Sequence, residues 1–262
     1  MEIVSTQNAR VKEWASLQEK KHRDKSGKYI IEGIHLVEEA LRAEEEVEVL
    51  AYDIERGMPA ELKDLLQAVQ GMEVIGVSAA VISKCSGTRT PQPVFAVLRK
   101  RGSGAEALLE RPDSLVVVLD GVQDPGNVGT IIRSADAAGA DGVVLGHGCA
   151  DLYNPKTIRS TMGSMFHLPV VEADLAELLS RARQAGVHLV STSLQATNSC
   201  YSYDFRGGQW LLIGSEGGGI SPEAAALVDR SVIIPMRGGA ESLNAAMAAT
   251  ILLFEAMRQR MG

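Results

Sequence analysis

The chain has 262 residues, of which 45% are hydrophobic, and it carries a formal net charge of −7. This length and composition predict one large or two ordinary globular domains with ample material for a core. The negative charge argues against a protein that coats nucleic acid with an overall basic surface.

Cysteine usage and hydropathy indicate the cellular environment in which the chain folds. Cys85, Cys149 and Cys200 are far apart and form no CxxC pair, which argues against a zinc site and a disulfide framework. The N-terminus lacks the apolar core of a secretory signal, and no apolar stretch is long enough to span a bilayer. We therefore expect a soluble, cytoplasmic protein with no metal and no membrane partner.

The first hundred residues alternate between helical and strand-like patterns, which is typical of an α/β domain. Pro59 lies near the first turn of one expected helix, a position that favours proline. The patterns predict helices over 7–22, 34–43, 59–69 and 78–84, and strands over 29–31, 46–52, 72–77 and 93–100.

Basic side chains gather within residues 10–28 of this domain. The patch has two interpretations, a solvated helix face or an arm that contacts phosphates. Its cations are Arg10, Lys12, Lys20, Lys21, Arg23, Lys25 and Lys28.

A segment rich in charge, glycine and proline separates the two halves of the chain. We place a linker over 106–112, which leaves a first domain over 1–105 and a second over 113–262. The second domain has near-continuous apolar strands, which predict a sheet that helices cover on both faces. Its expected strands span 115–120, 142–146, 168–171, 187–193, 210–214 and 231–235, and its expected helices 127–138, 156–164, 174–185, 222–228 and 242–259.

Three strands of the second domain are followed by loops whose polar residues a core would not choose. The strands end at Asp120, Gly214 and Pro235. Ligands in open α/β sheets bind at the carboxyl ends of the strands. The three loops are therefore expected to converge on one pocket.

The first loop leads into a helix at Gly126 and Asn127, and Asn127 is either its N-cap or a residue that faces a ligand. Arg133 interrupts the small and apolar residues that follow. Because Ile131 and Ile132 flank it, we expect burial on most sides, and a buried guanidinium needs an anion. We therefore predict that Arg133 faces an anion or a substrate.

The second loop begins after Gly214 with the run Ser-Glu-Gly-Gly-Gly, whose glycines allow the backbone to approach a ligand closely. Glu216 is a lone carboxylate at the strand end, and its alternative role is to cap the helix at Ser221. The run lacks the lysine of a P-loop and the spacing of GxGxxG, so its glycines alone are a weak signal.

The third loop leads to Ser242, Leu243 and Asn244 at the start of an alanine-rich helix. Ser242 is suited to cap that helix, and Asn244 can donate to and accept from a ligand. The helix is apolar on most sides, which indicates deep packing or a subunit interface.

The five histidines are scattered, and no Ser-His-Asp set, HxxxH pair or pair of carboxylates is evident. Hydrolytic and metal chemistry are therefore poorly supported. A backbone-lined pocket with one arginine, one glutamate and small polar side chains suits a preactivated cofactor better than a strong nucleophile.

The three loops resemble the three motifs of the SpoU (TrmH-type) RNA 2′-O-ribose methyltransferases of the SPOUT superfamily. Order and spacing agree with that family over 113–262. The segments 28–41 and 88–98 look like the family's RNA-binding domain, which is related to ribosomal proteins that recognise kinked RNA. The matching residues are Asn127, Gly129 and Arg133, then Gly214, Glu216 and Gly217, and finally Ile234, Pro235, Met236, Ser242, Leu243 and Asn244.

The resemblance implies a trefoil-knotted α/β catalytic domain with a mostly parallel sheet, preceded by a smaller α/β RNA-binding domain. In such a knot, residues 210–260 would thread through a loop formed earlier in the chain, and true knots are rare exceptions among folds. The family binds S-adenosylmethionine in the knot, and it is typically a homodimer with its site near the subunit interface.

The expected site residues follow from the same resemblance. Two roles for Arg133 stay open, help in deprotonating the ribose hydroxyl or stabilisation of a phosphate and the developing alkoxide. A pKa above ~12 makes an arginine a poor base. The catalytic set is expected to comprise Asn127, Arg133, Glu216, Ser242 and Asn244, and the cofactor to contact Thr192, Ser193, Gly214, Glu216, Gly217, Ile234, Met236 and Leu243.

The expected reaction is methyl transfer from S-adenosylmethionine to a ribose 2′-hydroxyl of RNA, with ribosomal RNA of the large subunit favoured. The alternatives are a tRNA 2′-O-methyltransferase and a noncatalytic RNA-binding or ribosome assembly factor on the same scaffold. A base-methylating SPOUT enzyme is disfavoured because Asn127 and Arg133 together indicate ribose chemistry. A nicotinamide-dependent oxidoreductase would need an intact GxGxxG.

Overall fold

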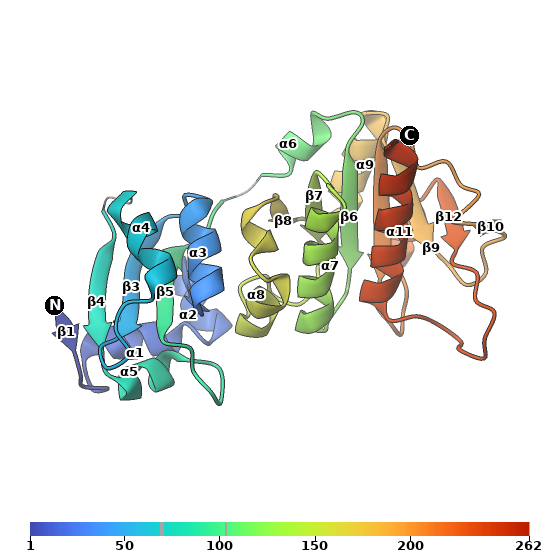
Figure 1. The fold of residues 1–262 in the computed structure, drawn as a ribbon. Helices are drawn as coiled ribbons and strands as arrows, with labels where there is room; N and C mark the ends of the chain where they lie inside the picture. Colours follow the sequence, from blue (N-terminus) through green and yellow to red (C-terminus); the bar gives the residue numbers. More distant parts are fainter. Residues whose placement is uncertain (69–70, 103, 262) are drawn as a thin grey trace. The chain divides into compact units, whose positions relative to one another are not determined.

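The computed structural model describes residues 1–68, 71–102 and 104–261. The chain forms two compact units (Figure 1). The first consists of 1–102 and 151–166, and the second of 103–150 and 167–262. The predicted domain boundaries at 105 and 113 stay predictions.

A five-stranded mixed sheet forms the centre of the first unit. Its strands are β1 (Glu2–Ile3), β2 (Lys28–Glu32), β3 (Val47–Asp53), β4 (Glu73–Val77) and β5 (Val94–Arg99). Their order in the sheet is β1-β4-β3-β5-β2, in which β1, β4 and β3 run parallel and β5 pairs antiparallel with β3 and β2. The sequence predicts four of these strands and misses β1, which has only two residues.

Helices cover both faces of this sheet, because successive residues in the middle of β2, β3 and β5 are buried and apolar and point to opposite faces. On one face lie α1 (Ala9–Ser16) and α5 (Ala79–Cys85), where Trp14 meets Phe95 edge to face. The other face is covered by α3 (Ile34–Arg42), α4 (Ala60–Ala68) and α8 (Pro155–Thr161), followed by a short 3₁₀ turn, η1 (Ser164–Phe166).

The single helix predicted over 7–22 is wrong. The chain forms α1 and then α2 (Lys20–Ser26), with a turn between them. The Arg23 guanidinium donates to the carbonyl oxygens of Leu17 and Gln18, each at 2.8 Å. A helix that continued through this turn would use those oxygens for its own backbone hydrogen bonds. The hydrogen bonds that the buried Arg23 guanidinium requires therefore favour the interruption of the helix between α1 and α2.

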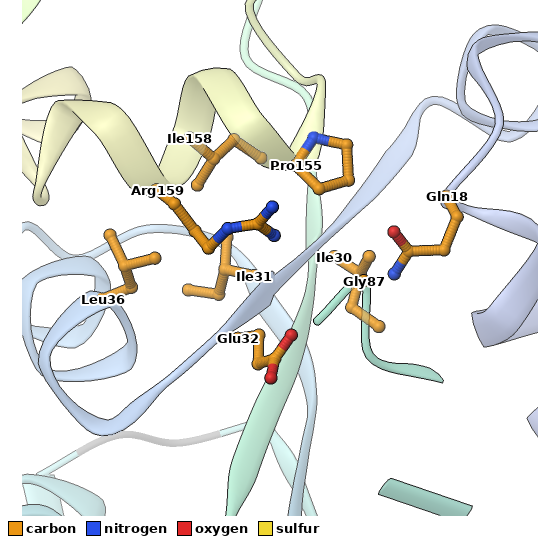
Figure 2. Close-up of a pocket in the computed structure, with 9 residues that line it drawn as sticks. All are labelled: Gln18, Ile30, Ile31, Glu32, Leu36, Gly87, Pro155, Ile158 and Arg159. Carbon is orange, nitrogen blue, oxygen red and sulfur yellow. The ribbon is translucent and has the colours of Figure 1, made fainter. Parts of the chain in front are cut away.

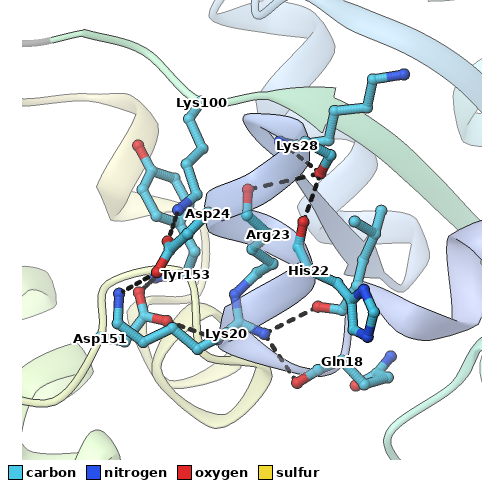
Figure 3. Close-up of polar contacts among 11 residues, drawn as sticks. Gln18, Lys20, His22, Arg23, Asp24, Lys28, Lys100, Asp151 and Tyr153 are labelled. Carbon is cyan, nitrogen blue, oxygen red and sulfur yellow. Dashed lines mark hydrogen bonds and ion pairs between the residues drawn. The ribbon is translucent and has the colours of Figure 1, made fainter.

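Arg23 also anchors the segment 151–166 to the first unit (Figure 3). It is 2% exposed, and its Nη2 lies 2.5 Å from Oδ2 of Asp151, which precedes α8. A guanidinium taken out of water is tolerated only when acceptors surround it. Nearby, Lys100 donates to Asp24 at 2.7 Å and lies over the ring of Tyr153.

The basic patch of residues 10–28 is only partly available to a partner. Arg23 is buried, Arg10 pairs with Glu73, and Lys28 pairs with Glu48. The cations of the patch that are exposed and have no side-chain partner in the described ranges are Lys12, Lys21 and Lys25.

An all-parallel sheet of seven strands forms the centre of the second unit, which confirms the predicted α/β fold. Its strands are β6 (Leu115–Asp120), β7 (Gly142–Leu145), β8 (Val170–Glu172), β9 (His188–Thr192), β10 (Asn198–Ser199), β11 (Gln209–Gly214) and β12 (Arg230–Ile233). Their order is β10-β12-β9-β11-β6-β7-β8. Strand β11 thus lies in the middle of the sheet, and the knotted threading of 210–260 stays a prediction.

Helices cover both faces of this sheet too. α6 (Glu106–Leu109), α9 (Leu175–Gln184) and α10 (Pro222–Ala225) contribute apolar side chains to one core, and α6 falls inside the predicted linker. α7 (Pro125–Ala137) and α11 (Ala245–Arg260) lie side by side (Figure 1). Ser134 and Thr250 join these two helices by a hydroxyl–hydroxyl hydrogen bond of 2.7 Å.

Candidate functional site

The carboxyl ends of β9, β11 and β12 surround a cavity of about 570 Å³ in the second unit. That volume lies within the roughly 300–1,000 Å³ of small-molecule sites. Ser242 lines the cavity, and so do all eight residues expected to contact a cofactor: Thr192, Ser193, Gly214, Glu216, Gly217, Ile234, Met236 and Leu243.

The glycine loop after β11 folds back tightly on the strand. Ser215 and Gly219 exchange two backbone hydrogen bonds of 3.0 Å, and the Ser215 hydroxyl accepts from the Gly218 N–H at 3.1 Å. A Cβ at Gly214 would lie 2.1 Å from the carbonyl carbon of Gly219. Glycine is therefore required at this position by the close approach of backbone to backbone.

Asp120 holds the far end of this loop. It lies buried at the end of β6, and its Oδ2 accepts from the backbone N–H of Ser221 at 2.6 Å. The Ser221 hydroxyl accepts from the Ala224 N–H and caps α10, so the capping role considered for Glu216 is wrong. The sequence reasoning missed Asp120, although a carboxylate directly after a run of five apolar strand residues was a signal.

Asp124, not Asn127, is the N-cap of α7. Its carboxylate accepts from the backbone N–H of Asn127 at 2.9 Å, and the helix begins at Pro125. Proline favours the first helical position and aspartate caps as well as asparagine, so the helix starts two residues earlier than predicted. The Asn127 side chain is thereby available for other contacts.

Asn244, not Ser242, is the N-cap of α11. Its Oδ1 accepts from the backbone N–H groups of Ala246 at 2.9 Å and Met247 at 3.3 Å. The helix therefore begins three residues later than predicted, and Ser242 borders the cavity instead. Asparagine is among the best capping residues, and here it uses only its oxygen for that purpose.

Three of the expected catalytic residues form a hydrogen-bonded chain across three loops. Nδ2 of Asn244 donates to Oδ1 of Asn127 at 3.0 Å, and Nδ2 of Asn127 donates to Oε1 of Glu216. Because the α11 backbone occupies Oδ1 of Asn244, the amide nitrogen of Asn244 must face Asn127. The start of α11 thus fixes the orientation of both amides, and the chain of donors ends on the Glu216 carboxylate.

Arg133 does not join this chain. Its side chain is exposed, does not line the cavity and has no partner in the part of the chain that the structure describes. The predicted burial is wrong, because Ile131 and Ile132 face the core while Arg133 leaves α7 on its outer side. Arg133 lies six positions after Asn127, which turns their side chains about 120° apart on an α-helix.

Residues 1–68, 71–102 and 104–261 contain no group of three or more His, Cys, Asp or Glu side chains that could hold a metal ion. No helix in the same ranges is long and apolar enough to cross a membrane.

Two stretches of the chain match known protein families. Residues 114–254, more than half of the chain, match the SpoU rRNA Methylase family. The chain belongs to the SpoU rRNA methylase family. Residues 8–96 match the MRM3-like substrate binding domain.

SpoU relatives resemble the chain along its whole length. A 23S rRNA (guanosine(2553)-2′-O)-methyltransferase, RlmP, of Bacillus subtilis is 38% identical over 97% of this chain and 98% of its own. A 23S rRNA (uridine(2479)-2′-O)-methyltransferase of Streptomyces viridochromogenes is 34% identical, over 98% of this chain and 92% of its own.

A solved SpoU structure supports the same assignment. The crystal structure of AviRb from Streptomyces viridochromogenes with AdoMet has a TM-score of 0.89 and 35% identity, over 97% of this chain and 99% of that chain. These matches confirm the predicted family and enzyme class, and the AdoMet in the relative confirms the expected cofactor for this family.

Proposed function

We propose that this chain transfers a methyl group from S-adenosylmethionine to a ribose 2′-hydroxyl of 23S ribosomal RNA. The observation that carries the proposal is the hydrogen-bonded chain of Asn127, Glu216 and Asn244, which joins three motif loops beside a cavity of cofactor size. The two relatives named above modify a guanosine and a uridine, so the scaffold accepts either base and the target nucleotide stays open.

The residues around the cavity fit S-adenosylmethionine. The hydroxyl groups of Thr192 and Ser193 and the backbone of the glycine loop offer polar contacts, and Ile234 and Met236 offer apolar surface for a ring. Apart from its two chain neighbours, no described residue has an atom within 4 Å of where a Cβ at Gly217 would be, so the loop backbone there borders open space. When bound, the cofactor supplies a methyl group that is already activated on a sulfonium.

The protein's own contribution is to place the ribose and to stabilise the charge that develops on its oxygen. We assign Arg133 to the RNA phosphate and the developing alkoxide, because a guanidinium stays protonated at neutral pH and cannot serve as a base. Glu216 keeps its Oε2 atom available to orient Arg133 or the ribose hydroxyl, since only Oε1 is used by Asn127. Ser242 borders the same cavity and is assigned to positioning.

Arg133 is proposed to act in the site of a second copy of the chain. Within one chain it points away from Asn127, and its guanidinium is exposed and unpaired in the described ranges. Beside α7, helix α11 exposes Met247 by 50% and Phe254 by 41%, seven residues and so about two turns apart. An apolar stripe of this kind is typical of a subunit interface. We therefore propose a homodimer in which α7 and α11 meet their counterparts.

The first unit is proposed to bind the RNA substrate, with 1–105 as the RNA-binding domain, 106–112 as linker and 113–262 as the catalytic domain. The MRM3-like match over 8–96 supports this assignment. We also propose a cytoplasmic location, where ribosomal RNA is made and where the free thiols of Cys85, Cys149 and Cys200 stay reduced.

A mixing experiment tests the proposal that Arg133 acts across a dimer. R133A is expected to be inactive for lack of the arginine, and G214A to be nearly inactive when S-adenosylmethionine is kept well below the raised Kd of that variant. A mixed dimer of the two would contain one site with an intact cofactor loop and the arginine of its partner. Recovery of activity on mixing is expected, and a mixed dimer that stays inactive would contradict the shared site.

The substrate is tested with RNA from cells that lack this enzyme. Tritium from methyl-labelled S-adenosylmethionine is expected in 23S rRNA and neither in 16S rRNA nor in tRNA. Label in tRNA alone would contradict the proposal and show that the chain is a tRNA methyltransferase instead. Cofactor binding without transfer to any RNA would favour the noncatalytic assembly factor.

A further inference from the structure

One arginine of the first unit is half-buried and has no partner among the residues that the structure describes. The arginines whose guanidinium groups make no hydrogen bond or ion pair in the described part of the chain are Arg89, Arg133, Arg159 and Arg237. Three of them are exposed, and only Arg159 is half-buried. A guanidinium has five N–H donors, and removing them from water costs free energy unless other acceptors replace the water molecules. The N–H donors of Arg159 are therefore available to a ligand.

Arg159 extends from α8 into a small hollow beside β2 (Figure 2). Ile30, Ile31 and Ile158 form an apolar wall of this hollow. Its volume is about 10 Å³, roughly the space that one water-sized group needs. A single oxygen atom of a ligand fits there, and a nucleobase does not.

Gln18 and Gly87 form the other side of the hollow. Nε2 of Gln18 donates to the carbonyl oxygen of Cys85 at 2.6 Å, which turns Oε1 of Gln18 toward Gly87. A Cβ at Gly87 would lie 3.0 Å from that oxygen and 3.4 Å from Nη1 of Arg159. The missing side chain at Gly87 therefore leaves an opening between an acceptor and a set of donors.

Glu32 also lines the hollow, but its carboxylate is already engaged. Oε2 accepts from the Ser86 hydroxyl at 2.7 Å, and Oε1 accepts from the Thr88 hydroxyl and the Gln92 N–H, each at 3.0 Å. These three donors occupy both carboxylate oxygens and hold the loop that carries Gly87. Glu32 therefore builds the rim of the hollow and leaves the Arg159 donors available.

We propose that one phosphate oxygen of the substrate RNA enters this hollow and accepts from Arg159. The 2′-hydroxyl of the same nucleotide stays at the rim, where it donates to Oε1 of Gln18. RNA offers both an anionic acceptor and a hydroxyl donor in each backbone unit. The inference rests on the proposed function and deepens it, because it places an RNA contact on the segment 151–166, outside the substrate-binding match over 8–96.

The test is filter binding of a labelled 23S rRNA transcript to full-length protein over a series of salt concentrations. R159Q is expected to raise the Kd about tenfold and to lower the slope of log K against log salt by about one phosphate contact. Its affinity for S-adenosylmethionine is expected to be unchanged. A wild-type Kd and slope for R159Q would overturn the inference.

R42Q is the matched control, because Arg42 is an exposed arginine of the same unit that pairs with Glu38 at 2.6 Å. It is expected to bind RNA as the wild type does, and an equal loss in R42Q would overturn the inference by showing a mere charge effect.

A second variant fills the hollow without removing a charge. G87A adds a methyl group between Gln18 and Arg159, and it is expected to weaken RNA binding while the melting temperature stays that of the wild type. Unchanged RNA binding by G87A would overturn the inference. Because these assays need no methyl transfer, an inactive wild type that binds RNA would contradict the proposed function and leave this site testable.

Discussion

The tight packing of the loop after β11 allows the effect of G214A on cofactor affinity to be predicted quantitatively. The added methyl carbon would lie 2.1 Å from the carbonyl carbon of Gly219, 2.3 Å from its oxygen and 2.3 Å from the Ile220 nitrogen. All three are backbone atoms, which cannot move aside as the end of a flexible side chain can. The loop must therefore shift by more than an ångström to reach an ordinary contact distance, and with it the wall of the cavity.

The expected cost can be estimated from the effects of overpacking. Forcing an extra methyl group into a packed site typically costs about 1–3 kcal/mol. If the bound cofactor requires the original loop, that energy appears as weaker binding, about 5- to 150-fold in Kd at 1.4 kcal/mol per factor of ten. Isothermal titration with S-adenosylmethionine measures this effect directly, and circular dichroism shows whether the fold is retained.

G238A is the matched control for G214A. Gly238 lies in the third motif loop. Apart from its two chain neighbours, none of the described residues has an atom within 4 Å of where its Cβ would be, so the same chemical change there meets open space. It is expected to bind the cofactor as the wild type does. A folded G214A with wild-type cofactor affinity would contradict this prediction, because the loop would then be able to move without consequence for the site.

Three further predictions concern the site, the acid stability and the thiols. N244D keeps the oxygen that caps α11 but loses the donor to Asn127, so its kcat is expected to fall while its melting temperature stays that of the wild type. N244A loses the cap as well as the donor, so its kcat is expected to fall and its free energy of unfolding to drop by about 1 kcal/mol. Hydrogen bonds from Arg258 lower the pKa of Glu255 from its ordinary 4.5 to about 2 in the folded chain. That stabilisation is full above pH 4.5 and is lost as the pH falls toward 2, so denaturant titrations should show a smaller acid loss in E255Q. Burial raises the pKa of the Cys85 thiol to about 12, so iodoacetamide at pH 8 should label it only after unfolding, and rapid labelling of native protein would contradict the burial.

The strands and the motif loops could be predicted from the sequence because their signals are local. Strand β6 coincides with the predicted 115–120, since five consecutive apolar residues suit a strand buried on both faces. The loops after β6, β11 and β12 were expected to meet in one pocket. Residues of the loops after β11 and β12 do line one cavity, together with residues after β9, whereas the loop after β6 reaches the site through the hydrogen bond of Asn127 to Glu216 and contributes none of the described lining residues. Strand order and knotting depend on contacts between distant segments, which periodicity does not encode.

The helix caps could not be predicted, because neighbouring candidates have similar capping propensity. Asp124 competes with Asn127, and Ser242 competes with Asn244. What decides between them is the tertiary arrangement in which Asn127 bonds to Asn244 and Glu216, and that arrangement is invisible until the three loops are brought together.

The place of the segment 151–166 was equally hidden. Its amphipathic pattern predicts a helix, and α8 spans Pro155–Thr161, but a pattern does not name the sheet on which a helix packs. Here Ile158 and Phe166 enter the core of the first unit, and Asp151 pairs with Arg23, 128 positions earlier in the chain. Arg159 is carried along with them, which is why the proposed RNA contact could not be found in the sequence.

The most direct test of the account is alkaline hydrolysis of RNA that the enzyme has labelled. A methyl group on the ribose 2′-oxygen blocks cleavage of the adjacent phosphodiester bond, so label from methyl-tritiated S-adenosylmethionine is predicted in alkali-resistant dinucleotides of 23S rRNA. Label in mononucleotides would mean that a base is methylated, and it would contradict the ribose chemistry assigned to Arg133 and Glu216.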